Sequence, residues 1–367
     1  MKKYCRVLFT ADLHSSNHLP YSKPMENSIT DRLLDLLEVI RKIINCAESY
    51  KAEAIFILGD TFDRSLVDAV TLTHTIKALT KTTIPIYVLP GNHDANSIRG
   101  GRFLVEAFGA IKHDKLKYLD KDVFLRDWLR FIPIPFMTIE ETENRIKEKK
   151  KEINEKLVNV LLFHNSILGC EHLKWVCDDG LDPELLTTDF NYAFGGHFHR
   201  PQSFGKNNNG FYVGAPLHHS FGDKERMAGF SIVEFHKDGK IKKSFIKSEA
   251  PSFHTTDKLK IGDKWQVGDY VRIIIECTHS DWITKKPQVE MFCDSMEGIN
   301  ISYKHKPIYH HKKRLASSKK EEKITLEKAL EDYVVSSEVV FGDLNRDILK
   351  AHGNRILQEV RTENGII

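Results

Sequence analysis

Residues 5–14 read CRVLFTADLH, a short apolar run that ends in an aspartate and a histidine. Two later stretches have the same form: residues 54–60 read AIFILGD, and residues 84–94 read IPIYVLPGNHD. Their apolar parts are rich in β-branched and aromatic side chains, which is typical of buried strands. Residues 29–47 and 66–80 lie between these stretches and place apolar side chains at helical spacing. This alternation predicts an α/β fold in which helices connect parallel strands.

The alternation of strands and helices continues beyond these stretches. Residues 140–156, EETENRIKEKKKEINEK, are so rich in charge that they predict a solvated surface helix. The apolar run that follows, residues 157–163, predicts another buried strand. Glycines and a DG turn separate shorter strands, which we expect at residues 192–194, 210–213, 229–235 and 242–246.

The composition changes near residue 250, which indicates a second domain. Residues 270–277 predict a strand, and residues 288–293 are a second strand candidate. Two short amphipathic helices are expected near residues 325–335 and 344–360. The sequence therefore divides into four predicted parts: a first domain of residues 1–250, a small α+β domain of residues 251–310, a basic linker of residues 311–323 and closing helices in residues 324–367.

Charge and cysteine usage exclude several classes of protein. The chain has 367 residues, and 54 lysines and arginines against 51 aspartates and glutamates leave a formal charge of +3. That charge is too close to balance to indicate a polyanionic partner. The six cysteines form no CxxC pair, which argues against a disulfide framework or a zinc knuckle and favours a reducing compartment. No GxxxxGKS or GxxxxGKT loop is present, which excludes ATP binding by that route.

Hydropathy argues against a membrane protein. The first apolar run meets a charge at Asp12, too early for a signal peptide, and no apolar stretch of about 18 residues occurs. We therefore expect a soluble, cytoplasmic protein with no membrane partner.

Polar clusters follow five of the predicted strands. In open α/β sheets the loops that leave the carboxyl ends of the strands meet at one edge, where ligands bind. The five clusters are Asp12-Leu13-His14, Gly59-Asp60-Thr61-Phe62-Asp63, Gly91-Asn92-His93-Asp94, His164-Asn165 and Gly195-Gly196-His197-Phe198-His199. Any one of them alone is explained by a turn or a buried histidine. Together and in this order they predict a single site.

The residue types in these clusters favour a metal centre. Aspartate, asparagine and histidine without a thiolate suit Mn²⁺, Fe²⁺ or Zn²⁺ better than Ca²⁺, and affinity alone does not choose among them. Two such ions about 3.5–4 Å apart hold both the attacking and the leaving oxygen of a phosphoryl displacement. Asp12 and His14, and likewise His197 and His199, are two residues apart. On an extended segment this spacing would place both side chains on one side.

The motifs DxH, GDxFD, GNHD, a lone histidine after a strand and GHxH, in this order, resemble the calcineurin-like metallophosphoesterases. Within that superfamily, GGHFHRPQ at residues 195–202, YVGAP at 212–216 and SFGDK at 220–224 resemble the SbcD-type DNA-repair nucleases. The resemblance covers roughly residues 1–250, and the chain is short, as compact phage-encoded versions are. It implies an α/β fold: a two-sheet sandwich flanked by helices, with a small α+β capping domain and C-terminal helices.

The resemblance also implies a ligand set and two divalent ions. The first ion would be held by Asp12, His14, Asp60 and His199, and the second by Asp60, Asn92, His164 and His197. Asp60 would bridge them. Two Mn²⁺ are expected, with Mg²⁺, Fe²⁺ or Zn²⁺ as alternatives, and a water between the ions would be the nucleophile.

Further residues receive roles beside the ligands. The resemblance implies that His93 orients the phosphate and protonates the leaving oxygen, and an imidazole titrating near 6.5 suits that task. Asp94, the next residue, is expected to belong to the catalytic site together with His93 and to fix either the His93 ring or the turn. Asp63 stands where some relatives have a histidine, and we expect it to orient a ligand. Arg200 would contact a phosphate or form a surface ion pair. His218 and His219 are interpreted as loop residues.

The resemblance implies a two-metal DNA nuclease, a double-strand 3′→5′ exonuclease and single-strand endonuclease, in DNA end processing, repair and recombination. Its partners would be DNA and an SbcC-type SMC-like ATPase. Two copies of this chain would form a homodimer within a heterotetramer that includes the ATPase. The complex would be cytoplasmic, either at the nucleoid or, for a phage-encoded version, in the host cytoplasm. The closing helices would dock on the ATPase or fold back on their own chain. The basic residues 304–323 would contact DNA phosphates or form a solvated linker. The alternative is a phosphatase or phosphodiesterase acting on a non-DNA phosphoester.

Overall fold

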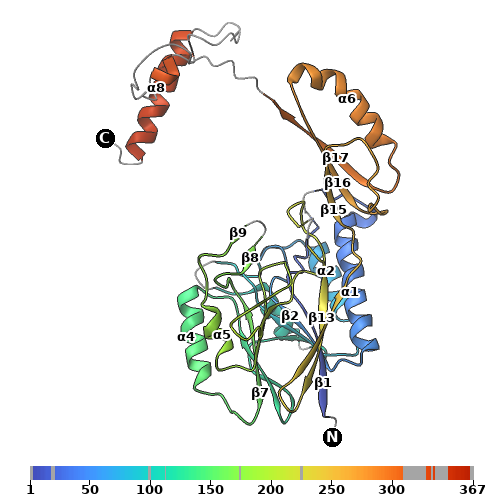
Figure 1. Cartoon of the computed structure of the whole chain (residues 1–367), viewed down its shortest axis with the longest axis vertical. Coiled ribbons are helices and arrows are strands. Elements are labelled where there is room, and N and C mark those ends of the chain that lie inside the picture. The colour runs from blue at the N-terminus through green and yellow to red at the C-terminus, as the bar shows by residue number, and fades with distance from the viewer. Residues whose placement is uncertain are drawn as a thin grey trace. The chain divides into compact units, whose positions relative to one another are not determined.

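A computed structural model describes most of the chain (Figure 1). The described residues are 3–17, 21–97, 101–111, 113–172, 175–223, 226–308, 328–331, 334 and 346–363. They belong to two compact units, residues 1–308 and residues 309–367. No helix in these described ranges is long and apolar enough to cross a membrane.

The first sheet has six strands in the order β14-β13-β1-β2-β3-β4. Strands β1 to β4 run parallel, whereas β13 and β14 pair antiparallel. Its members are β1 (Tyr4–Thr10), β2 (Ala54–Leu58), β3 (Ile86–Leu89), β4 (Leu116–Tyr118), β13 (Gly229–His236) and β14 (Ile241–Lys247). Helices α1 (Asp31–Ser49) and α2 (Ala69–Leu79) are the predicted connections between its parallel strands. Shorter helical turns are η1 (Glu26–Ser28), η2 (Leu104–Glu106) and α3 (Ala107–Ala110).

The second sheet also has six strands, in the order β11-β12-β10-β7-β6-β5. Its four inner strands run parallel, and both edge strands are antiparallel. Its members are β5 (Val123–Arg126), β6 (Leu129–Ile134), β7 (Val158–His164), β10 (Tyr192–Gly196), β11 (Gln202–Phe204) and β12 (Gly210–Tyr212). Helices α4 (Ile139–Lys150) and α5 (Pro183–Thr187) belong to this half, as does the short hairpin β8 (Glu171–His172) and β9 (Trp175–Val176).

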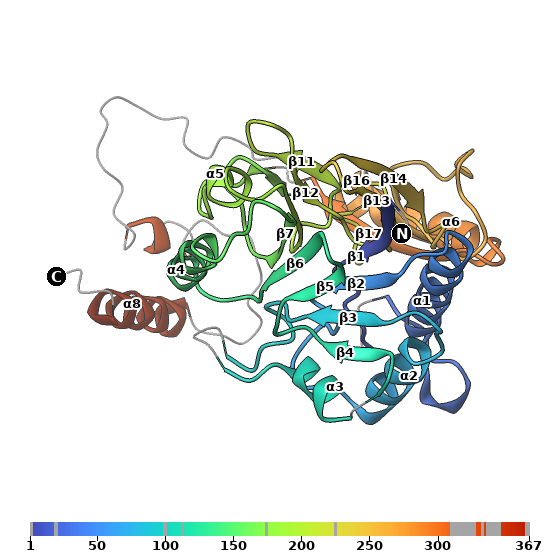
Figure 2. The same ribbon diagram turned by 90° about the horizontal axis from the view of Figure 1, so that it is seen from below.

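The two sheets pack face to face, and helices cover their outer faces. Aromatic side chains from both sheets fill the space between them: Phe9, Phe56, Phe131, Phe194 and Phe235. The rings of Phe9 and Phe194 stack with their centroids 4.5 Å apart. Helices α1 and α2 pack on the first sheet, and α4 and α5 pack on the second (Figure 2). The predicted two-sheet sandwich flanked by helices is therefore confirmed.

A small parallel sheet of three strands follows the sandwich in the same unit. It contains β15 (Phe253–Thr256), β16 (Tyr270–Cys277) and β17 (Asn300–Pro307), and helix α6 (His279–Asp294) packs on it. The predicted strand at residues 288–293 is wrong, because these residues lie in α6. Val289 is buried in the small core, and Phe292 and Cys293 pack against it. The apolar spacing i, i+3, i+4 on one helix face explains the pattern that we interpreted as a strand.

Aromatic and charged side chains join the small sheet to the sandwich. The hydroxyl of Tyr270 donates to Asp31 Oδ2 across 2.9 Å. The buried guanidinium of Arg32 lies 4.9 Å from the Tyr270 ring centroid and 5.1 Å from that of Phe253. Phe221, from the loop before β13, packs in the same cluster.

Strand β6 was missed in the sequence. Its residues read LRFIPI, and Pro133 is unusual in an inner strand because proline lacks a backbone donor. The structure resolves this conflict, since β5 pairs with β6 only as far as Phe131. Beyond that point β6 has no strand partner on this side among the described residues.

The second unit contains helix α8 (Arg346–Glu363), which overlaps the predicted helix at 344–360. Residues 328–331 and 334 are also helical, and Glu331 forms an ion pair with Lys350. The side chains of Ile348 and Ile356 on α8 are exposed. The predicted linker at 311–323 lies outside the described residues.

Candidate metal centre

The polar clusters converge where strands of both sheets end. Three groups of side chains each place one ligand atom per residue within 4.8 Å of the others. These groups are His14, Asp60 and His93; Asp60, His164 and His197; and His14, His199 and His219. Asn92 lies in the second group, because its side-chain oxygen contacts both His164 and His197. Asp12 lies beside this group, because its carboxylate accepts the backbone N–H of His197. The structure thus brings together all seven side chains that were expected as metal ligands.

The backbone at four of these residues is left-handed. The φ angles are 54° at Asp12, 45° at His14, 49° at Asp60 and 101° at His197. Such conformations cost about 1–3 kcal/mol each in residues other than glycine and cluster at functional sites. The expectation that Asp12 and His14 lie on an extended segment is therefore wrong, since β1 ends at Thr10 and a left-handed backbone directs both side chains.

Hydrogen bonds between the loops hold this backbone in place. The N–H of Asp12 donates to the Gly59 carbonyl across 3.0 Å, and the N–H of His14 donates to the Asp60 carbonyl across 2.9 Å. Gly59 itself has a φ of 93°, and a Cβ there would collide with the His164 ring. A side chain at this position would therefore displace a predicted ligand.

The group around Asp60 has the donor set of a divalent metal site. His164 Nδ1 lies 2.7 Å from the Leu58 carbonyl, which only accepts, so this nitrogen carries the proton. The opposite nitrogen, Nε2, lies 3.2 Å from Asp60 Oδ2 and 3.1 Å from Asn92 Oδ1. His197 Nδ1 lies 2.9 Å from the same Asn92 oxygen. Two imidazole nitrogens, an amide oxygen and a carboxylate therefore face one point, and the Leu58 carbonyl orients the His164 ring as the outer partner of a ligand histidine does.

The group around Asp12 has a similar character. The Nε2 atoms of His14 and His199 lie 3.2 Å apart, and His14 Nε2 lies 3.7 Å from Asp60 Oδ2. The Asp12 carboxylate is fully buried and accepts the backbone N–H of His197 across 3.0 Å. His14 Nδ1 is buried without a hydrogen-bond partner among the described residues. The close, buried nitrogen and oxygen ligand atoms of His14, His199 and Asp60 fit a second divalent ion.

Burial and mutual charge shift the ionisation of this centre. Burial raises the pKa of Asp12. Burial is also the largest single influence on Asp60, but the charge and hydrogen bond of His164, with the charges of His14 and His93, together lower its pKa. Burial likewise opposes the charged form of His164, but the Asp60 carboxylate raises its pKa to about 9. Burial and the charge of His164 together lower the pKa of His197 to about 3. Without metal the centre therefore holds a positive imidazole, His164, close to the carboxyl groups of Asp12 and Asp60.

His93 lies at the solvent side of the centre. Its ring is exposed and meets the ring of His14 edge-on, with centroids 4.6 Å apart. His93 Nδ1 lies 2.7 Å from the Asp63 carbonyl and so donates to it, and this leaves Nε2 for an external group. The backbone N–H of His93 donates to Asp60 Oδ1 across 2.9 Å.

Asp94 is fully buried and contacts the turn rather than the His93 ring. Its carboxylate accepts N–H groups from Gly91, Phe62 and Thr61 at 2.9, 3.0 and 3.3 Å. Burial, with the nearby Asp60 charge, raises its pKa to about 7. These contacts place Asp94 between the loops that carry Asp60 and Asn92, where it fixes their relative position.

The remaining candidates lie at the margin of the centre. Asp63 Oδ1 lies 3.7 Å from His14 Nδ1, which suits an orienting role. Of the two alternatives for Arg200, the structure shows the ion pair, since its exposed guanidinium contacts Glu171. Two residues were missed: Asp223, whose Oδ1 lies 3.6 Å from His199 Nδ1, and His219. The SFGDK motif contained Asp223 and was the available signal.

Comparisons with known proteins agree with this geometry. The family model described as Calcineurin-like phosphoesterase matches residues 5–201. The SbcD component of the nuclease SbcCD from Staphylococcus epidermidis is 25% identical over 274 residues, which are 66% of this chain and 69% of that protein.

Solved structures also resemble this chain. A dimetal phosphatase from Danio rerio is 12% identical, with a TM-score of 0.42, over 67% of this chain and 97% of the phosphatase. Yfce, a phosphoesterase from E. coli, is 14% identical, with a TM-score of 0.32, over 66% of this chain and 100% of Yfce.

We predict that metal binding releases protons. Near neutral pH the metal-free protein holds His164 protonated, because its pKa is raised to about 9, and a ligand imidazole must be neutral. Metal affinity should therefore rise with pH toward about 9. In the metal-free protein the same shift stabilises the fold fully below the ordinary value of 6.5, and this stabilisation is lost as the pH rises through about 9.

Calorimetric titration with Mn²⁺ in two buffers of different ionisation enthalpy measures the released protons. The observed heats should differ between the buffers. His164→Gln should abolish the difference and weaken binding, whereas the control His236→Gln, at the half-exposed end of β13, should retain both. Equal heats for the unaltered protein in both buffers would show that His164 is not protonated in the metal-free state.

Proposed function

This chain belongs to the calcineurin-like phosphoesterase family, and from that premise we propose that it is a two-metal DNA nuclease of the SbcD type. It would act as a double-strand 3′→5′ exonuclease and a single-strand endonuclease in DNA end processing, repair and recombination. The carrying observation is the convergence of seven ligand side chains beside an exposed histidine, His93. This arrangement offers a metal centre that a phosphodiester can reach from solvent.

The chain's own residues divide the chemical work. Asp12, His14, Asp60 and His199 would hold one ion, and Asp60, Asn92, His164 and His197 the other. When bound, two divalent ions supply an activated water and neutralise charge on the phosphoryl group. His93 would orient the phosphate and give a proton from Nε2 to the leaving oxygen, because its Nδ1 is engaged with the Asp63 carbonyl. Asp94 would position the two loops through the backbone N–H groups that its carboxylate accepts.

Two observations favour DNA over another phosphoester. A relative of the chain is named as a nuclease component. The SFGD loop at residues 220–223, one of the motifs of the resemblance, contacts both the centre and the small sheet. The small domain and the basic residues 304–323 would hold the duplex through phosphate contacts, which position DNA without reading its sequence. The alternative, a phosphatase or phosphodiesterase for a non-DNA phosphoester, uses the same ligands and differs in substrate alone.

We also propose a division of labour along the chain. Residues 1–250 would form the nuclease domain, 251–310 the capping domain and 311–323 the linker. Residues 324–367 would dock on an SbcC-type SMC-like ATPase. The exposed Ile348 and Ile356 on α8 support this docking, as does the name of the relative, which is one component of SbcCD. The chain would act as a homodimer in this assembly.

The ligand types of the centre indicate which metals we expect, and the state of the cysteines indicates the compartment. Imidazole and carboxylate ligands are compatible with two Mn²⁺, with Mg²⁺, Fe²⁺ or Zn²⁺ as alternatives. All six cysteines are free thiols, which supports a reducing cytoplasm.

The proposal predicts Mn²⁺-dependent cleavage of linear duplex DNA. Cleavage should be faster with Mn²⁺ than with Mg²⁺, which favours a more hydrated octahedral site. Gel assays of an end-labelled duplex measure it, beside para-nitrophenyl phosphate as the monoester substrate. Asp60→Ala should abolish cleavage, because both ions lose their shared ligand. Efficient hydrolysis of the monoester with intact DNA would establish the phosphatase alternative instead.

His93→Ala should separate chemistry from metal binding. Proton donation and phosphate positioning typically contribute about 10²–10⁴-fold, so kcat should fall by that order while DNA affinity changes little. Mass spectrometry of the purified variant should still find two metals, and His236→Ala is the matched control. Loss of one metal from His93→Ala would make His93 a ligand and refute the role as an acid.

Deletion of residues 320–367 should remove partner binding and leave the nuclease intact. The deleted part lies within the second compact unit, whereas the sandwich and the metal centre belong to the first. Single-strand nicking with Mn²⁺ should persist, whereas co-purification with the ATPase should be lost. The full-length double variant Ile348→Glu, Ile356→Glu should lose co-purification as well. Full recovery of the ATPase with the truncated chain would place docking elsewhere.

A further inference from the structure

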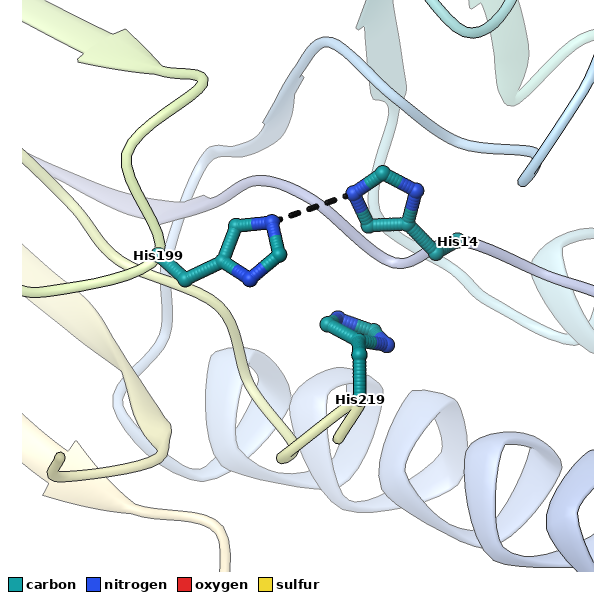
Figure 3. Close-up of side chains that lie close together, drawn as sticks. All are labelled: His14, His199 and His219. Atoms are coloured by element: carbon teal, nitrogen blue, oxygen red, sulfur yellow. Dashed lines mark hydrogen bonds between the residues drawn. The ribbon is translucent and has the colours of Figure 1, made fainter. Parts of the chain in front are cut away.

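A third histidine lies beside the first ligand group. His219 stands in the loop between β12 and β13, far in sequence from His14. Its ring centroid lies 4.7 Å from that of His14 and 5.0 Å from that of His199. One ring nitrogen from each of the three lies within 4.8 Å of the others. Figure 3 shows the three side chains gathered together. Sequence patterns assigned no role to His219, and neither of the two ligand sets that the family resemblance implies includes it.

The hydrogen bonds of His219 assign the proton on its ring. Nε2 lies 2.9 Å from the backbone carbonyl of Asp12, and a carbonyl oxygen only accepts, so Nε2 must donate. In the neutral ring, Nδ1 then carries the lone pair. Nδ1 is buried and has no hydrogen-bond partner among the described residues. An unpaired buried acceptor costs free energy, which a cation at this position would recover.

The loop around His219 is fixed on both sides. The carboxylate of Asp223 accepts the backbone N–H groups of His219 and Ser220, each across 3.1 Å. The carbonyl of the preceding residue, His218, accepts from the buried guanidinium of Arg32. Asp223 also lies 3.6 Å from His199, so the same side chain positions two of the three imidazoles. The His219 ring is thus held in place by its surroundings rather than left to a free loop.

We propose that His219 is a further ligand of the first metal, through Nδ1, so that three imidazoles join the carboxylates of Asp12 and Asp60 there. This inference rests on the metal centre of the proposed function and is independent of DNA as the substrate. It differs from the alternative in which His219 serves only to hold the Asp12 backbone.

A third imidazole changes the metal preference of one site. Imidazole favours zinc, iron and other borderline ions, whereas carboxylate, carbonyl and water suit manganese and magnesium. The first site would have three nitrogens, and the second would have two, from His164 and His197. The first site should therefore bind Zn²⁺, Co²⁺ or Fe²⁺ more selectively, and the second should accept Mn²⁺ more readily. The centre would discriminate between its two ions.

The direct test is a crystal structure of the unaltered, full-length chain loaded with Zn²⁺. His219 Nδ1 should lie at bonding distance, about 2.0–2.1 Å, from the first zinc ion. A first zinc ion bound by His14 and His199, with His219 Nδ1 more than about 3 Å away, would overturn the proposal. This measurement needs no substrate, so it stands or falls separately from the nuclease assay.

A solution test uses His219→Gln, whose amide can still donate to the Asp12 carbonyl but lacks the ring nitrogen. Titration with Co²⁺, followed by visible absorption and chelator competition, should show one of two ions bound at least about tenfold more weakly, with altered absorption bands. The matched control is His218→Gln in the same loop, because the His218 ring contacts the Arg226 carbonyl instead of the centre. Its affinities and spectrum should match the unaltered chain. An unchanged spectrum and affinity in a folded His219→Gln protein would reduce His219 to a backbone contact.

Discussion

Two buried carboxylates, Asp12 and Asp60, impose the main constraint on this molecule. A carboxylate removed from water is costly unless positive charge or hydrogen-bond donors surround it. Here imidazoles and backbone N–H groups surround both, and one imidazole, His164, is held in its charged form when no metal is bound. Divalent cations, when they bind, would likewise compensate the buried negative charge of these carboxylates. The left-handed backbone, the loop glycines and the histidines all serve to keep these two carboxylates close together.

The sandwich core sets the distances within this centre. Phe9 and Phe194 stack between the sheets, one from β1 and one from β10. Three residues beyond each of them stand Asp12 and His197, and the backbone N–H of His197 donates to the Asp12 carboxylate. The packing of the two sheets therefore determines how the loops meet. Because protein cores are close-packed, a change between the sheets would shift ligands as well as cost stability.

Local sequence patterns revealed most strands of the two six-stranded sheets and all five polar clusters, because each depends on neighbours within a few residues. Patterns failed where distant contacts decide. No strand was predicted at β6, where the short strand β5 leaves Pro133 without a partner on one side, among the described residues, while β7 pairs with it on the other. The spacing of Asp12 and His14 suggested an extended segment, whereas hydrogen bonds to the Gly59 and Asp60 carbonyls hold a left-handed one. No local pattern predicted that His219 lies at the centre, because this follows from its contact with His14, about 200 residues earlier in the chain.

The loop that carries His219 also connects the centre to the small sheet. Two residues after His219, Phe221 packs on Phe253, with ring centroids 4.9 Å apart, and the guanidinium of Arg272 lies 3.8 Å above the Phe221 ring. At the other side, the Asp223 carboxylate reaches His199. The small sheet and the metal centre thus share one short segment of backbone. A displacement of the small sheet would act on this segment, as well as on the contacts that Tyr270 and Arg32 make between the small sheet and the sandwich. This loop, rather than the strands of the sandwich, contacts both the small sheet and the predicted ligand His199, and so connects them directly.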